Sequence, residues 1–151
     1  MSKQGISIIE HFSNILSYLQ KVSEELKNNS NTQELIEKYK LDYLRIGIES
    51  DISRIQDILN ETLKKKEEDE NNEDINREVR EVLIAIHEAA LDIHQHFIDI
   101  AEKFIQYIQT FDDNILDQIK ERINSGVFKL EELKQINTKL TEILNYRKYE
   151  I

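Results

Sequence analysis

Apolar residues recur three and four positions apart along most of the chain, which is the spacing of one face of an α-helix. This pattern predicts helices over residues 6–28, 33–66, 73–110, 113–124 and 129–147. The predicted helix over about 73–110 would be about 57 Å long, at a rise of 1.5 Å per residue. We therefore expect an all-α fold: an elongated, antiparallel four- or five-helix bundle with this one very long central helix.

Short polar stretches and glycines mark the predicted ends and irregularities of the helices. In "NNSN", Asn31 can cap the helix that follows it. In "NSG", Gly126 lies just past the predicted end of a helix, where glycine commonly ends one. Gly47 lies inside a predicted helix, where glycine costs ~1 kcal/mol against alanine. It is therefore expected to mark a bend or a close helix contact.

The charged stretch "KKKEEDENNED" separates two predicted helices at about residues 64–74. Its lysines come first, which suits the negative end of a helix dipole, and its acids come last, which suits the start of the next helix. Asn71 or Asn72 is the expected cap. We interpret residues 1–151 as a single helical-bundle domain with a charged connector at about 64–74.

The composition narrows the possible partners and compartments. The formal net charge of −10 opposes binding to nucleic acid and to anionic membranes, so neither is expected as a partner. The absence of cysteine excludes disulfide and thiolate chemistry and is consistent with a cytoplasmic location. No segment predicts a signal peptide or a membrane span. Abundant isoleucine, lysine, glutamate and asparagine suggest a bacterial or phage source.

Three of the four histidines lie in "AIHEAALDIHQHFIDI", at residues 85–100. Two histidines on one helix bind one zinc ion when they are four residues apart. His87 and His94 are seven apart, about 10 Å along the axis, and His96 points away from His94. No histidine has a glutamate three positions before it, as di-iron bundles require. We therefore expect no metal and no cofactor.

His87 and His94 fall on a second apolar stripe of the long predicted helix. We expect this stripe to form an interaction or packing seam, and because a buried imidazole must be neutral or paired, both histidines are candidates for pH sensitivity. The seam consists of Leu83, Ile84, His87, Leu91, His94, Ile98 and Ile105. His96 has Asp92 and Asp99 one turn away, so it is expected at the surface, in an acidic setting that favours its charged form.

The stretch "REVREVLIAIH" places six residues between Arg80 and His87. It resembles the Arg-x4–6-His element of HEPN-type ribonucleases, which are also helical bundles. The resemblance implies metal-independent RNA cleavage by Arg80 and His87. It covers eight residues, and Glu81 departs from the family pattern because the position after the arginine is often polar there. An acid at that position and the net charge of −10 both oppose phosphate binding.

The sequence favours a non-enzymatic helical protein that acts by protein–protein interaction. In one form the apolar surface of the long helix joins copies, as in a coiled coil, and gives a homo-oligomer. In the other an acidic face binds a basic protein partner, as an immunity protein, antitoxin, phage inhibitor or adaptor would. Added salt weakens electrostatic binding steeply and an apolar seam little, so salt dependence separates the two forms.

Overall fold

The computed structural model describes the backbone of residues 2–150 and the side chains of residues 5–145. These residues form helices without any strand, which confirms the predicted all-α fold. The helices are α1 (Ser2–Asn28), α2 (Thr32–Lys38), α3 (Leu41–Glu70), α4 (Arg77–Thr110) and α5 (Asp113–Glu150).

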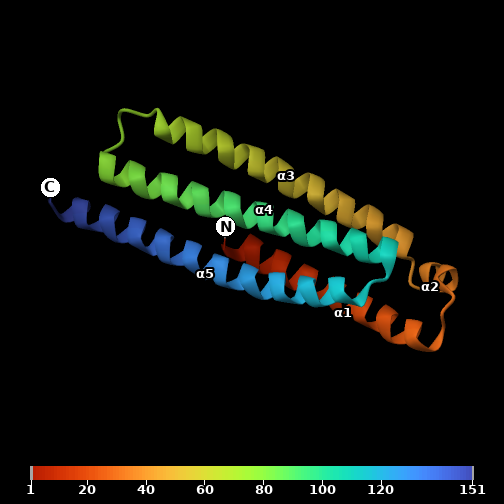
Figure 1. Cartoon of the computed structure of the whole chain (residues 1–151). Helices are drawn as coiled ribbons and strands as arrows, with labels where there is room; N and C mark the ends of the chain where they lie inside the picture. Colours follow the sequence, from red (N-terminus) through yellow and green to blue (C-terminus); the bar gives the residue numbers. More distant parts are fainter. Residues whose placement is uncertain (1, 151) are drawn as a thin grey trace.

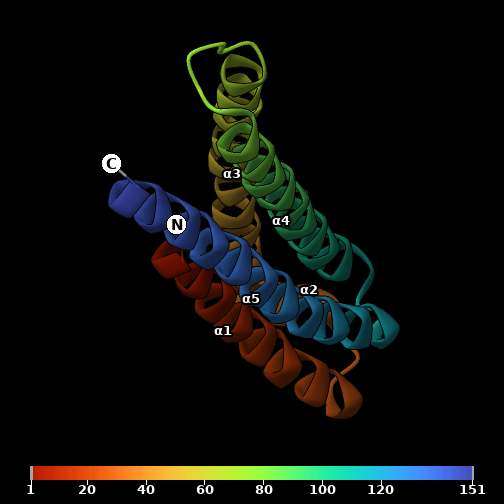
Figure 2. The ribbon, with the colours of Figure 1, turned by 90° about the vertical axis from the view of Figure 1, so that its left-hand side faces the viewer.

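The four long helices form an elongated antiparallel bundle with α4 at its centre (Figure 1). α4 packs against α3 on one side and α5 on the other, and α1 packs against α5. Seen end-on, the α3–α4 pair and the α1–α5 pair diverge toward one end of the molecule (Figure 2). The backbones of α1 and α3 do not approach each other closely. We call the gap between these two helices the open seam.

An aromatic cluster fills the centre of the bundle. Phe12 of α1 meets Phe97 edge-to-face at 6.0 Å between ring centroids and lies 5.7 Å from Phe104. Tyr107 is fully buried one turn further along α4. Aromatic side chains bury large areas, so this cluster fixes α1 against α4, although the backbone of α1 runs closer to α5 than to α4.

The predicted helix over 33–66 starts near Thr32, where α2 starts, but it is wrong in its interior and at its end. It is interrupted between α2 and α3, where Lys40 has a φ of 52°, in the left-handed region that ends a helix. It also continues to Glu70, because Lys66 lies 3.6 Å from Glu70 one turn later and 3.6 Å from Glu88 of α4. This second contact crosses to another helix and has no signature in the local sequence.

The connector is therefore shorter than predicted and covers residues 71–76. Its cap is Asn76, whose side chain accepts a hydrogen bond from the backbone N–H of Glu78 at 2.8 Å, rather than Asn71 or Asn72. The cap at Asn31 is confirmed, since its side chain accepts from the N–H of Glu34 at 3.2 Å.

The predicted stop at "NSG" is also wrong, because α5 runs through residues 124–126 without a break. Gly126 is buried, and a Cβ at this position would lie 3.1 Å from Cδ1 of Ile9 and 3.4 Å from Cδ2 of His96. Gly126 therefore serves close packing inside a helix, and that packing offsets its poor helix propensity. Gly47 makes no close helix contact, since nothing lies within 4 Å of a Cβ built on it.

Among the described residues, none of the helices combines the length and the apolar character needed to cross a membrane.

Candidate functional site

His87 is covered by α3 of the same chain. Its Nε2 lies 2.6 Å from Oδ2 of Asp69, and its side chain is only 15% exposed. His87 therefore has a polar partner within the chain, unlike a histidine in a wholly apolar seam.

The sequence predicts His96 at an acidic surface, and this prediction is wrong. His96 is half-buried, and its Nε2 lies 2.6 Å from the backbone carbonyl oxygen of Arg122 in α5. Because a carbonyl only accepts, Nε2 carries the proton in this bond. The missing side chain at Gly126 leaves room for this ring, which the sequence of α4 alone could not indicate.

His94 is the most buried of the three, at 8% exposure. Neither ring nitrogen has a hydrogen-bond partner among the described residues, and Nδ1 is fully enclosed. Burial lowers the pKa of His94 from its ordinary value of 6.5. The imidazole is therefore neutral at pH 7.

The remaining members of the predicted seam share the side of α4 on which His87 meets α3. Ile98 is buried, and Leu83, Ile84, Leu91 and Ile105 are half-buried. Helical spacing and the His87–Asp69 contact show that α3 shields this side of α4. Within one chain the stripe packs α3 on α4, and its use between two chains stays a prediction.

Arg80 closes the loop between α3 and α4. Its Nη2 donates to the backbone carbonyls of Asn72, at 2.5 Å, and Ile75, at 3.2 Å. Arg80 and His87 thus hold separate contacts about 10 Å apart along α4, and neither lines the cavity between the four long helices. Ribonuclease activity by this pair stays a prediction, to be checked by RNA cleavage with a His87→Ala variant.

A cavity of about 390 Å³ lies between α1, α3, α4 and α5, next to the open seam. Its walls are mostly apolar and come from all four helices. They include Ile8, Phe12, Ile55, Ile93, Phe97 and Leu133. His94 lines it from α4, and His11, Asp51 and Arg54 line it from the two helices of the seam.

The polar group at the seam is centred on a buried carboxylate. Asp51 is 8% exposed, and its Oδ2 lies 2.7 Å from Nε2 of His11 on α1. Its Oδ1 accepts from Nη2 of Arg54 at 2.5 Å. Both carboxylate oxygens are therefore satisfied, and among the described side chains this is the hydrogen-bonded link between α1 and α3.

Sequence reasoning missed this group, although one signal for it exists. Asp51 lies between Ile48 and Ile55 on the buried stripe of α3, and a carboxylate at such a position needs a partner. His11 has no such signal, because it lies forty positions away from Asp51 on another helix.

The described side chains contain no group of three or more histidines and acids able to hold a metal ion. The chemistry available in the cavity is hydrogen bonding by a neutral imidazole within apolar walls. Comparisons with protein-family models, curated proteins and solved structures gave no match.

Proposed function

We propose that this protein is a non-enzymatic helical interaction protein that binds a basic protein partner through one face of α3. This face consists of Tyr43, Ile46, Gly47 and Ser50, whose spacing puts them on one side of the helix. We call it the α3 face. The observation that carries the proposal is the exposure of Tyr43 (75%) and Ile46 (58%) beside the open space over Gly47.

An exposed aromatic residue next to a glycine suits the approach of a second helix. Tyrosine contributes a large contact area at a small cost in side-chain entropy and is enriched at binding hot spots. A glycine leaves room for a partner's side chains, as Gly126 does for those of Ile9 and His96 inside this bundle. The α3 face thus offers an anchor and a point of close contact for an amphipathic helix.

Charge decides which kind of partner is favoured. Exposed acids lie on α3 near this face, among them Asp42, Glu49 and Asp57. The whole chain carries −10, so a second copy would bring an equal negative charge to the interface. Like charges slow and weaken association, whereas a basic partner is attracted. A basic amphipathic helix is therefore the proposed occupant.

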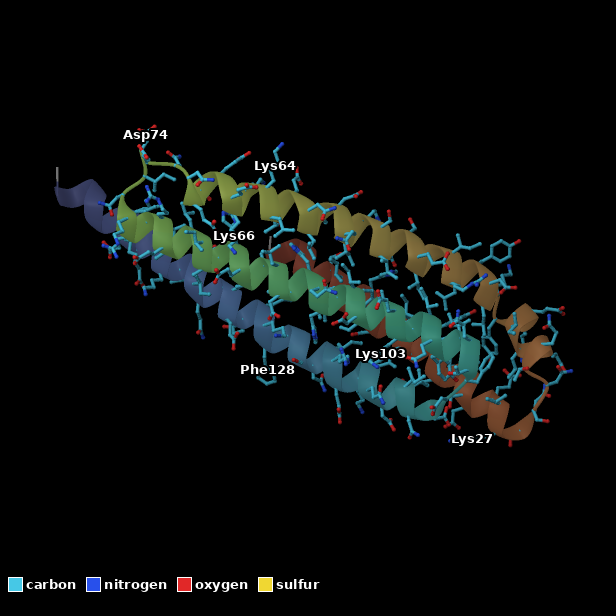
Figure 3. The ribbon with its side chains drawn as sticks, turned by 45° about the horizontal axis from the view of Figure 1, so that its top comes forward. Lys27, Lys64, Lys66, Asp74, Lys103 and Phe128 are labelled. Atoms are coloured by element: carbon cyan, nitrogen blue, oxygen red, sulfur yellow. The ribbon has the colours of Figure 1, made fainter. Side chains whose placement is uncertain are left out.

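The test is a titration with a fluorescent helical peptide that has leucines along one face and lysines elsewhere, with a scrambled peptide as reference. A Tyr43→Ser, Ile46→Ser double variant should weaken binding about tenfold or more, because it removes both anchors. The matched control is Phe128→Ser. Phe128 is 73% exposed and points away from the bundle on α5 (Figure 3). This control should change binding less than about twofold.

Added salt should weaken binding to the unmodified protein, since the attraction is partly electrostatic. Equal losses in the Phe128→Ser and the double variant would overturn the proposal. Sedimentation of the protein alone provides a second check. A dimer that dissociates in the Tyr43→Ser, Ile46→Ser variant would assign the α3 face to self-association instead.

A further inference from the structure

We propose that the cavity between the four long helices binds a small, uncharged amphipathic molecule with a compact apolar body and one hydroxyl group. The proposal rests on the cavity and on His94, and it does not depend on the partner assigned to the α3 face.

The size and walls of the cavity set the body of the ligand. A volume of about 390 Å³ lies in the range of small-molecule sites, roughly 300–1,000 Å³. Phe12 and Phe97 line it and meet edge-to-face, so an aromatic or compact aliphatic body can pack against their rings. Apolar walls of this kind favour a ligand that loses apolar surface from water.

His94 sets the polar group of the ligand. Its side chain lines the cavity, is more than nine-tenths buried, and has no hydrogen-bond partner among the described residues. Nε2 has no hydrogen-bond partner among the described residues, so its hydrogen-bonding capacity is free for a group that enters the cavity. Nδ1 is enclosed, which leaves Nε2 as the nitrogen that a ligand can reach. A hydroxyl can donate or accept, so it suits either tautomer.

The charges at the seam exclude an ionic ligand. Asp51 and Arg54 neutralise each other, and His11 occupies the second oxygen of Asp51. No unpaired charge among the cavity-lining residues remains to replace the hydration that an anion or cation would lose on entry. A carboxylate would also approach the carboxylate of Asp51. An uncharged molecule avoids both costs.

Three probes of similar shape separate these chemistries: 1-naphthol, 1-methylnaphthalene and 1-naphthoate. Binding is measured by calorimetry or by NMR shifts of the unmodified protein. We expect 1-naphthol to bind about fivefold more tightly than 1-methylnaphthalene, the effect of one net hydrogen bond. Binding of 1-naphthoate should be weaker than binding of 1-naphthol.

Variants assign the binding to the cavity. Ala90→Leu adds side-chain volume inside the cavity and should weaken binding of both uncharged probes at least tenfold. Ala89→Leu is the control, because Ala89 is half-buried and does not line the cavity. His94→Leu should remove the preference for 1-naphthol, and His94→Gln should restore part of it. Thermal melting of each variant verifies that it is folded.

Several results would overturn the proposal. Equal binding of 1-naphthol and 1-methylnaphthalene would remove the role of His94, and tightest binding of 1-naphthoate would make the site anionic-selective. Absence of binding by all three probes would refute the site. The Tyr43→Ser, Ile46→Ser variant should bind 1-naphthol normally, so failure of the proposed partner surface would leave this site standing.

Discussion

The two sides of α1 differ in how closely they are packed. Toward α4 and α5, a Cβ on Gly126 would lie within 3.6 Å of Ile9, His96 and Phe97. Toward α3, α1 is held by His11 on Asp51. On the exposed face of α3, nothing lies within 4 Å of a Cβ built on Gly47. The same residue type thus serves close packing in one helix and leaves free surface in another. The cavity lies beside the loosely packed side of α1, and the α3 face is a separate exposed surface.

Gly126→Leu should give the largest effect, because it adds a side chain on the tightly packed side of α1. The new side chain would collide with Ile9 and His96, and overpacking of a core costs ~1–3 kcal/mol, occasionally more. We expect a loss of about 3 kcal/mol in the free energy of unfolding, measured by urea denaturation. Ser125→Leu is the control, because Ser125 is exposed on the same turn of α5. Equal stability of the two variants would contradict the tight crossing.

Local patterns predicted the long helices well and their interruptions poorly. The apolar period of α4 and the cap at Asn31 depend on neighbours in sequence, so they were predictable. The continuity of α5 through Gly126 and the extension of α3 to Glu70 depend on contacts with other helices. Tertiary packing overrides propensity at such places, and a single sequence does not contain that information in readable form.

Contacts between helices also determine which residues of the candidate site could be predicted from the sequence. His94 was singled out correctly as a histidine on an apolar stripe, because helical spacing alone places it there. Its position on a cavity, and the pairing of His11 with Asp51 across the seam, follow from how α1 and α3 are placed. The prediction for His96 is wrong because it depends on acids of the same helix, whereas the hydrogen-bond partner of His96 is a backbone carbonyl of α5.

Low pH should reduce the free energy of unfolding through His94. Because burial lowers the pKa of His94 below its ordinary value of 6.5, the unfolded chain takes up a proton before the folded chain does. The free energy of unfolding therefore falls as the pH falls through 6.5, and this loss ends below the folded pKa. We expect His94→Leu to reduce the difference in stability between pH 7.5 and pH 5, measured by urea denaturation at both values.

His87→Gln is the comparison for that experiment. His87 is hydrogen-bonded to Asp69, and its substitution leaves His94 in place, so this variant should keep the loss of stability in acid that His94 causes. The groups that line the cavity with His94 are His11, Asp51 and Arg54, and all three are kept in both variants. Identical pH profiles for the two variants would show that the two sites do not differ in this respect.

Gly47→Ala should have the smallest effect, and it tests whether the space beside Gly47 on the α3 face is empty. Alanine is favoured over glycine in a helix by ~0.5–1 kcal/mol, and no atom opposes the added methyl group at Gly47. We expect the free energy of unfolding to rise by about that amount. Gly126→Ala should gain less, because its Cβ would lie 3.1 Å from Cδ1 of Ile9. If Gly126→Ala stabilises as much as Gly47→Ala does, the crossing of α1 and α5 can accommodate a methyl group without strain. The close packing assigned to that side would then be incorrect.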